Sequence, residues 1–355
     1  MADTIRAIKV LGKWGTNLAL GRRRPVVAVF SMTDYCNFYC PMCPFGDPNK
    51  EGQMNIAKTS DLTTEQWKMV FDKVSKYCFW SIIEGGEPTS RPDFMELVRY
   101  LHSIKMPTTL ITNSSLLHVV DLDKLKKYVR FVTCSIDSTY EEPYCKVRGV
   151  TPRIFRRVMD NLRLLTKHGV PHYFNSVITK FNTQEFIDHT YFDRAKELGA
   201  SAVSLTFVED RSDVNYSLLP DRETMVKVCK NVLDYMKKPD SLPMLIPAEY
   251  FHQIIEHGRT LFDECGVWKS VFVNANGTVM VPCWKFNKPE NTYSLLEKSI
   301  DEIWNAPEWE IARTCHDCKV LGCIWTSSQP ISMVARSYLR GLSKILSQQR
   351  PEVAS

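Results

Sequence analysis

Short apolar runs alternate, from residue 26 onward, with longer segments in which apolar residues recur at helical spacing. The short runs predict buried strands, and the periodic segments predict helices. The predicted strands are 26–31, 79–84, 108–113, 131–137, 173–179 and 203–208. The first predicted helix begins near residue 63, and further helices are predicted over 92–105, 121–128, 152–168, 184–198 and 221–237. Such alternation predicts an α/β fold with a parallel sheet. Because six strands are too few for a closed eight-stranded barrel, we expect an open, partial (β/α)6 TIM-like barrel.

The pattern changes after about residue 250. Two short apolar runs, 270–274 and 278–281, flank Ala275-Asn276-Gly277, which predicts a β-hairpin. A predicted helix near 299–313 and a cysteine-rich run follow. We therefore expect a small α+β domain after the barrel. The predicted division is an N-terminal helix 1–25, a barrel 26–250, a second domain 251–326, and a C-terminal helix and tail 327–355.

Both ends of the chain carry an apolar stripe beside basic residues. The stripes are Ile5, Ile8, Leu11, Trp14 and Leu18 at one end, and Val334, Tyr338, Leu342 and Ile345 at the other. Such helices either pack their apolar stripe on the body of the protein or lie in a membrane interface, and the pattern leaves both open. No apolar run is long enough to span a bilayer, so any membrane contact is expected to be peripheral.

Composition narrows the class of protein. An apolar content of 44% and a charged content of 24% are those of a globular chain. The formal charge of +5 is mild, and no nucleic-acid partner is expected. Twelve cysteines without a secretory signal predict a reducing, cytoplasmic compartment and metal sites, not a disulfide framework.

Three cysteines, Cys36, Cys40 and Cys43, follow the first predicted strand in one short loop. Thiolates suit iron–sulfur clusters, and three of them can hold three irons of a four-iron cluster while the fourth iron stays open. A zinc loop or buried thiols are the alternatives. A structural zinc site needs four ligands, and no fourth cysteine or histidine lies nearby in sequence.

Further polar residues follow the ends of other predicted strands. They are Gly85-Gly86-Glu87, Asn113, Ser135, Asp137 and Asn175. The carboxyl ends of parallel strands meet at one rim, where α/β folds place their chemistry. For Asn113 and Ser135 taken singly, a cap at the end of a strand is an equally good interpretation.

The cysteine triplet and the Gly85-Gly86-Glu87-Pro88 turn together resemble the radical S-adenosylmethionine (radical SAM) superfamily over about residues 26–210. The resemblance implies a [4Fe–4S] cluster on the three cysteines, whose open iron binds S-adenosylmethionine and yields a 5′-deoxyadenosyl radical. By the same resemblance, Gly85 and Gly86 let the backbone approach the cosubstrate, and Glu87 accepts from its ammonium group. Contacts to ribose and carboxylate would come from Asn113, Ser135, Asp137 and, less directly, Asn175. The implied redox partner is a one-electron reductant such as flavodoxin or ferredoxin.

A second cysteine set lies in the predicted second domain. Cys265 and Cys283 bracket the hairpin, and Cys315, Cys318 and Cys323 follow. Zinc would suit four such thiolates. The arrangement resembles the twitch and SPASM auxiliary-cluster domains, with a spacing similar to that of 2-deoxy-scyllo-inosamine dehydrogenases. That resemblance implies one auxiliary [4Fe–4S] cluster on Cys265, Cys283, Cys315 and Cys318, with Cys323 either unused or exchanging with Cys318.

A fully ligated auxiliary cluster implies electron transfer, and hence a radical SAM oxidoreductase. The substrate radical would lose one electron, and Glu209 or Asp210 is the candidate proton acceptor. The expected substrate is a sugar, a cyclitol or a lipid-linked molecule. Alternatives are radical epimerisation, with Cys145 as hydrogen donor, and bond formation on a lipid or peptide. A non-catalytic electron carrier is a further alternative, although it would not need the glycine–glutamate turn.

Overall fold

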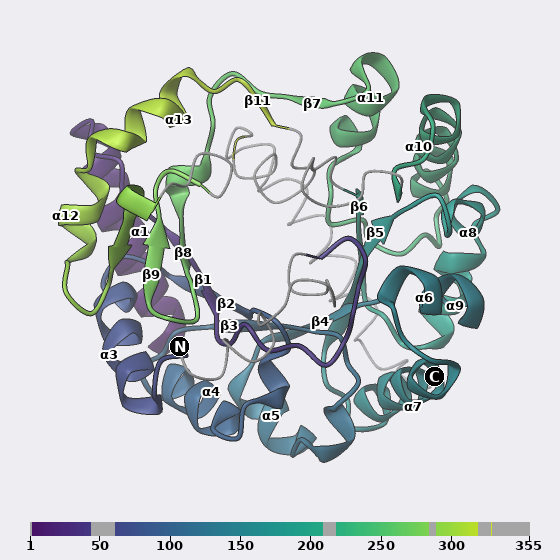
Figure 1. Cartoon of the computed structure of the whole chain (residues 1–355), viewed down its shortest axis with the longest axis horizontal. Coiled ribbons are helices and arrows are strands. Elements are labelled where there is room, and N and C mark those ends of the chain that lie inside the picture. Colours follow the sequence, from purple (N-terminus) through teal and green to yellow (C-terminus); the bar gives the residue numbers. More distant parts are fainter. Residues whose placement is uncertain (1, 44–60, 209–217, 284–288, 319–327, 329–355) are drawn as a thin grey trace, which may run out of the picture.

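The computed structural model describes residues 2–43, 61–208, 218–283, 289–318 and 328. Its centre is a curved open sheet with helices around the outside (Figure 1). The candidate residues Glu209, Asp210 and Cys323 lie outside the described residues, as does the predicted C-terminal helix. Their assignments stay predictions.

Six parallel strands form the barrel wall in chain order. They are β1 (Val27–Ser31), β2 (Trp80–Glu84), β3 (Thr108–Thr112), β4 (Phe131–Ser135), β5 (His172–Ile178) and β6 (Val203–Phe207). Each strand pairs in parallel with the next one along the chain. The predicted partial (β/α)6 barrel is therefore confirmed, with all six strands within a residue or two of their predicted ends.

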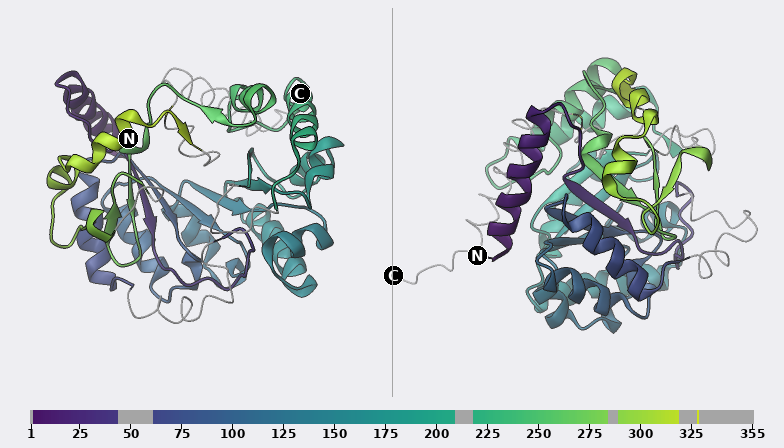
Figure 2. Two further views of the ribbon diagram at one scale, coloured as in Figure 1. Left: turned by 45° about the horizontal axis from the view of Figure 1, so that its top comes forward. Right: turned by 90° about the vertical axis from the view of Figure 1, so that its left-hand side faces the viewer.

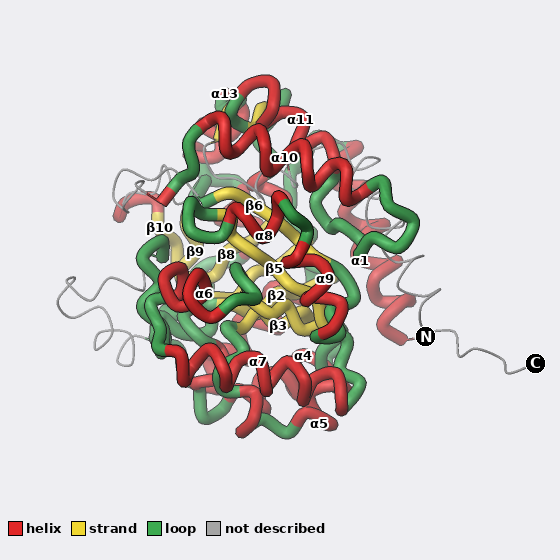
Figure 3. The backbone as a smooth tube through the Cα atoms, turned by 90° about the vertical axis from the view of Figure 1, so that its right-hand side faces the viewer, coloured by secondary structure: helices red, strands yellow, loops and turns green. Residues whose placement is uncertain are grey.

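Helices follow the strands and cover the outer face of the sheet (Figure 3). They are α3 (Thr64–Ser75), α4 (Phe94–Ser103), α5 (Leu122–Tyr128), α6 (Glu141–Arg148), α7 (Pro152–Lys167), α8 (Thr183–Ile187), α9 (Thr190–Glu197), α10 (Arg222–Met236) and α11 (Ala248–His257). Thr63 caps α3, where its side chain accepts from the backbone of Gln66 and the Gln66 side chain reaches back. The single helix predicted over 184–198 is wrong. His189 adopts a left-handed conformation with φ of 70°, which separates α8 from α9.

The predicted hairpin continues the barrel sheet. Its strands β8 (Ser270–Val273) and β9 (Thr278–Met280) are followed by β10 (Thr292–Ser294). Strand β8 pairs in parallel with β1, so that one nine-stranded sheet runs from β10 to β6. The division of the chain near residue 250 stays a prediction. In the structure, the pairing of β8 with β1 joins the segments on its two sides through backbone hydrogen bonds.

Short elements complete the C-terminal part of the described chain. Strands β7 (Thr260–Leu261) and β11 (Asp317–Cys318) form a small antiparallel ladder. The helix predicted over 299–313 is divided into α12 (Ile300–Trp304) and α13 (Glu310–Thr314). Pro307 begins a short 3-10 turn between them, because its ring removes a backbone donor from a continuing α-helix.

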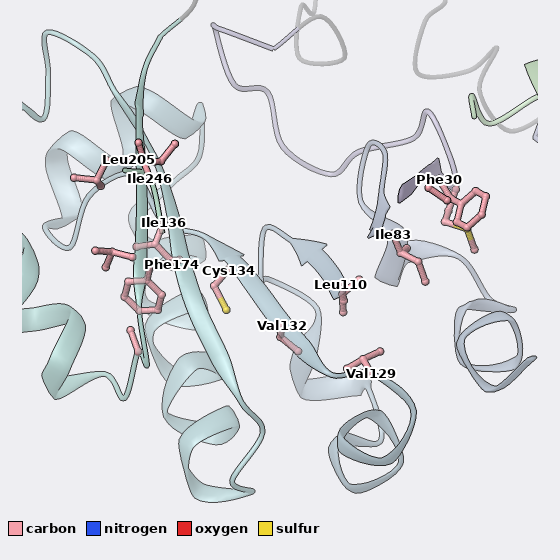
Figure 4. Packing of buried hydrophobic residues seen from close by; sticks show 14 of the residues in the cluster. Phe30, Ile83, Leu110, Val129, Val132, Cys134, Ile136, Phe174, Leu205 and Ile246 are labelled. Atoms are coloured by element: carbon pink, nitrogen blue, oxygen red, sulfur yellow. The ribbon is translucent and has the colours of Figure 1, made fainter. Parts of the chain in front are cut away.

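The hydrophobic core lies between the sheet and its outer helices (Figure 4). Phe30 of β1 packs against Trp67 and Phe71 of α3, with ring centroids 5.9 Å and 4.8 Å away. Successive side chains of a strand point to opposite faces, so the neighbours of these core residues face the inside of the barrel. Several of those neighbours are polar and half-buried, among them Ser31, Glu84, Ser135 and Asn175.

Helix α1 (Ala2–Ala19) lies along the outside of the molecule (Figure 2). The interpretation that its apolar stripe packs on the body is wrong for four of the five residues, since Ile5, Ile8, Leu11 and Leu18 are exposed. Only Trp14 of the stripe packs inward, where it stacks on Trp268 at 6.4 Å between centroids. Within the described residues, no helix is both long and apolar enough to cross a membrane.

Candidate active site at the cysteine loop

The cysteine loop and the glycine–glutamate turn are held together by backbone hydrogen bonds. Met32 donates to the Glu84 carbonyl at 2.8 Å, where β1 and β2 end side by side. Gly86 then donates to Thr33, and Glu87 donates to Tyr35, each at 2.7 Å. Two motifs that are far apart in sequence therefore form one rigid unit at the carboxyl ends of the strands.

Both glycines of the turn are required by the chain's own packing. A Cβ on Gly86 would lie 2.1 Å from the Tyr35 carbonyl oxygen and 2.8 Å from the Cys36 nitrogen. Gly85 has a φ of +136°, and a Cβ there would lie 2.5 Å from the Thr33 oxygen. The sequence suggested these glycines for close approach of a cosubstrate, and the structure adds close approach of the cysteine loop itself.

The three thiols of the loop lie close enough to interact electrostatically. Cys40 is buried, and Cys36 and Cys43 are half-buried. Burial raises the pKa of Cys36 to about 11 and that of Cys40 to about 12. Without a bound cation these side chains are therefore neutral thiols at physiological pH, and a metal centre must displace their protons.

The donor set of three cysteine thiols suits a four-iron cluster, which takes thiolate ligands. Among the residues that the structure describes, no three His, Cys, Asp or Glu side chains converge as ligands of one ion do. A four-iron cluster binds each thiolate through a different iron, so its ligands are spread more widely. Cys36 also has polar support, since its Sγ accepts from the Phe38 backbone at 3.4 Å and from Asn113 Nδ2 at 3.9 Å.

Glu87 is fully buried and is bound by donors from within the chain. Its Oε1 accepts from Thr112 Oγ1 at 2.7 Å and from the backbone and hydroxyl of Thr89. Its Oε2 accepts from the Asn113 backbone at 2.8 Å. The Glu87 carboxylate thus joins the turn to β3. Both of its oxygens accept hydrogen bonds from the chain itself, and its contact with the ammonium group of the cosubstrate stays a prediction.

Asn113 connects Glu87 to the cysteine loop. Its Nδ2 donates to Asn37 Oδ1 at 2.9 Å, and Asn37 in turn donates to Ser115 Oγ at 2.9 Å. Since Asn113 Nδ2 also contacts the Cys36 sulfur, the side chain supports a ligand residue. This is a different role from the predicted ribose or carboxylate contact, which stays untested.

Asp137 is also held within the chain, by an ion pair with a residue that sequence reasoning missed. Arg148 at the end of α6 approaches it with 2.7 Å between Nε and Oδ2, and Oδ1 accepts from the Val177 backbone at 2.8 Å. Arg148 also interacts with the Cys40 thiol, whose pKa it lowers against the dominant effect of burial.

Glu84 is a second residue that sequence reasoning treated only as the end of a strand. Its side chain lies on the inner face of β2, where it pairs in register with Ser31 of β1. Burial raises the pKa of the Glu84 carboxyl from 4.5 to about 7. On the neighbouring strands, Ser135 and Asn175 pair across β4 and β5 and are half-buried at the same rim.

Cys145 is not brought to this rim. It is half-buried on α6, and the charged groups that affect its thiol are Glu141 and Arg156. The structure therefore places it toward α7, and its suggested role as a hydrogen donor stays a prediction.

The second cysteine set is partly described. Cys265 interacts electrostatically with Cys315 and Cys283, and burial raises its pKa to about 11. The β7–β11 ladder pairs the backbone of Cys318 with Thr260, which brings this segment to Cys265. Three described thiols and the backbone of a fourth cysteine thus gather beside the barrel, as a ligated cluster requires.

Comparison with known proteins agrees with this geometry. A family model described as the radical SAM superfamily matches residues 30–192, and one described as the SPASM iron–sulfur cluster-binding domain matches residues 265–323. The chain belongs to the radical SAM superfamily and carries a SPASM-type domain. These domains imply S-adenosylmethionine and two [4Fe–4S] clusters as its cofactors.

Three curated relatives are similar to this chain, which spans about half to three quarters of their lengths. The antilisterial bacteriocin subtilosin biosynthesis protein AlbA of Bacillus subtilis is 26% identical over 80% of this chain and 60% of its own length. The AdoMet-dependent heme synthase of Methanosarcina barkeri is 31% identical over 52% of this chain and 51% of its own length. The PqqA peptide cyclase of Gluconobacter oxydans is 24% identical, with coverage of 79% and 76%.

Solved structures share the fold. SuiB of Streptococcus suis bound to S-adenosylmethionine is similar with a TM-score of 0.65 and 18% identity, over 86% of this chain and 71% of that one. The structure of anSMEcpe with bound AdoMet has a TM-score of 0.64 and 17% identity, with coverage of 91% and 94%.

Proposed function

We propose that this radical SAM enzyme oxidises a peptide substrate by two electrons. The observation that carries the proposal is that one continuous sheet joins the two cysteine sets. The first set follows β1, and Cys283 of the second set follows β9, at the opposite ends of the strands. The peptide class is supported by the printed names of relatives, which include a bacteriocin biosynthesis protein and a peptide cyclase. A solved structure of similar fold is that of SuiB bound to its precursor peptide.

The reaction would balance as follows. A substrate C–H bond gives its hydrogen atom to the 5′-deoxyadenosyl radical, and the substrate radical then loses one electron and one proton. Bound at the two cysteine sets, the clusters would supply the electron that cleaves S-adenosylmethionine and take up the one that the substrate radical loses. Flavodoxin or ferredoxin is the proposed source of the first electron.

Glu84 is the described carboxyl best suited to accept the proton. It faces the inside of the barrel, and its raised pKa lies near physiological pH, where a group can both accept and release a proton. Glu209 and Asp210, which follow β6, remain candidates for the same role.

The test starts from anaerobically reconstituted, full-length protein reduced with dithionite in the presence of S-adenosylmethionine. Chromatography should detect 5′-deoxyadenosine. A candidate peptide encoded beside the gene should lose the mass of two hydrogen atoms, with one 5′-deoxyadenosine formed per product. A peptide that instead gains one deuterium in heavy water without net mass loss would indicate epimerisation and overturn the oxidation.

A small-molecule or lipid-linked substrate is the second candidate, and the exposed apolar face of α1 favours it. Incubating the reduced enzyme with peptide, cyclitol and isoprenoid-linked substrates in separate reactions distinguishes the classes. Only the true substrate should accelerate 5′-deoxyadenosine formation above the rate without substrate. No 5′-deoxyadenosine under any condition, despite intact clusters, would indicate a non-catalytic electron carrier.

A further inference from the structure

Helix α1 is attached to the body through Arg6 and Trp14. Arg6 donates to four backbone carbonyls, including those of Ser75 at 2.6 Å and Cys78 at 2.9 Å. Trp14 donates from Nε1 to the Arg24 carbonyl at 2.9 Å and stacks on Trp268. These contacts fix the rotation of the helix about its axis, because Arg6 and Trp14 lie two turns apart on the same side.

The other apolar side chains of α1 face away from the body. Ile8 is 64% exposed and Leu11 is 40% exposed, and Ile5 and Leu18 extend the same face to both ends of the helix. Gly12 and Gly15 lie between them, and a Cβ built on either glycine meets no atom within 4 Å. A helix with this arrangement leaves its hydrophobic stripe uncovered, which is unusual for a surface helix of a globular domain.

Basic residues border this face, and the nearby acids are already paired. Lys9 and Arg22 are exposed, and residues 4–24 contain no acidic side chain. Arg23 contacts Glu264 at 2.7 Å. Arg24 contacts Asp301 at 2.6 Å. Asp3, in the first turn of α1, is the acidic residue of this helix. Among the described residues, Lys9 and Arg22 therefore place positive charge beside the apolar side chains of α1.

A pocket lies where α1 ends. It has a volume of about 340 Å³, and its lining includes the arginine run Arg22–Arg24, the tryptophans Trp268, Trp304 and Trp309, and the acidic Glu310. Because Arg23 and Arg24 already contact carboxylates, Arg22 is the arginine of this run that is left to bind a phosphate. The exposed Leu18 and Leu20 directly precede this run in sequence. The exposed Arg22 and the tryptophans, next to an apolar surface, suit an anionic headgroup whose acyl chains continue onto that surface.

We propose that the outer face of α1 and the pocket at its end dock this protein on an anionic phospholipid bilayer. Ile8, Leu11 and their neighbours enter the interface, and a headgroup phosphate lies in the arginine–tryptophan pocket. A second copy of the helix is disfavoured as the occupant, because two basic surfaces would repel one another. The proposal is independent of which substrate the active site takes.

The test measures binding of the reconstituted, full-length protein to sedimented vesicles. Vesicles of phosphatidylcholine with phosphatidylglycerol should bind it, and vesicles of phosphatidylcholine alone should bind it about tenfold less well. The double substitution Ile8→Gln/Leu11→Gln should lower the partition coefficient about tenfold or more. Arg22→Glu should weaken binding to the anionic vesicles while leaving the weak binding to neutral vesicles unchanged.

Matched controls come from exposed positions outside α1 and the pocket at its end. Val119 is 70% exposed, and Val119→Gln should leave vesicle binding unchanged. Lys230→Glu on α10 reverses an exposed charge away from α1 and should have at most a small effect. Iron content and 5′-deoxyadenosine formation should be the same in all of these variants.

Three outcomes would overturn the proposal. Equal vesicle binding by the wild type and the Ile8→Gln/Leu11→Gln variant would remove α1 as the docking surface. A dimer in light scattering that this variant abolishes, without vesicle binding, would make a second copy the occupant. Vesicle binding only after truncation beyond residue 328 would mean that residues 329–355 occupy the face instead.

Discussion

Asp137 and Arg148 form a buried ion pair, with 2.7 Å between the carboxylate Oδ2 and the guanidinium Nε. The pair joins the loop after β4 to the end of α6, beside the Cys40 thiol. It is a contact between segments that the sequence did not connect. Because Arg148 also interacts with the predicted cluster ligand Cys40, substitutions in this ion pair test how the barrel wall stabilises the cysteine loop.

Substituting Arg148→Met should destabilise the protein strongly, because it leaves the Asp137 carboxylate buried without its cation. The expected loss is about 3–5 kcal/mol in the free energy of unfolding. Chemical denaturation followed by circular dichroism measures it. The control is Lys146→Met on the same helix, whose ion pair with Glu142 is exposed and should contribute less than about 1 kcal/mol. An equal loss in the free energy of unfolding for the two substitutions would show that the buried ion pair stabilises the protein no more than the exposed one does.

Adding one methyl group at Gly86 should disrupt the cysteine loop, since the new Cβ would overlap the backbone of Tyr35. We expect Gly86→Ala protein to keep only the auxiliary cluster, with about four iron atoms per chain instead of about eight. Gly12→Ala is the matched control, because a Cβ there meets open space. Full iron content in the Gly86→Ala protein would contradict the close packing of the two motifs.

The ligand sets can be separated by removing one at a time. Replacing Cys36, Cys40 and Cys43 by alanine should leave about four iron atoms, bound by the auxiliary set. Replacing Cys265, Cys283 and Cys315 should also leave about four, together with 5′-deoxyadenosine formation. Metal analysis by mass spectrometry checks both counts. Zinc in place of iron at the second set would argue against an electron-accepting role.

Glu84 should give the protein a pH-dependent stability. Burial raises its pKa from 4.5 to about 7, so the folded protein keeps a proton that the unfolded chain releases between these values. The free energy of unfolding contributed by this group therefore falls as pH rises through that window, by at most about 3 kcal/mol. The Glu84→Gln variant should lose this part of the dependence, whereas Glu197→Gln, at an exposed position on α9, should keep it.

The same variant tests the proposed chemistry. Glu84→Gln should still form 5′-deoxyadenosine but should give less oxidised product per cosubstrate consumed, because the proton acceptor is gone. Comparing the two yields in one reaction separates a missing proton acceptor from a misfolded site. An unchanged ratio of oxidised product to 5′-deoxyadenosine would argue against Glu84 as the proton acceptor and would favour Glu209 or Asp210 in that role.

Much of the fold could be predicted from local pattern. Apolar runs and periodic segments gave all six barrel strands, and Asn276-Gly277 gave the hairpin between β8 and β9. The spacing of Cys36, Cys40 and Cys43 defined the class of site in the same way. These features are local, because a strand or a ligand loop is encoded by residues that are neighbours in sequence.

Long-range relationships could not be predicted in this way. Periodicity states which residues of α1 share a side, but the backbone carbonyls that bind Arg6 decide which side faces the body. Likewise, no pattern in 270–273 indicates that β8 pairs with β1. Sequence by itself determined the elements and the chemistry of the thiols. Tertiary structure decided the exposed face of α1, the partner of Asp137 and the half-buried position of Glu84 inside the barrel, because each depends on a surface supplied by a distant segment.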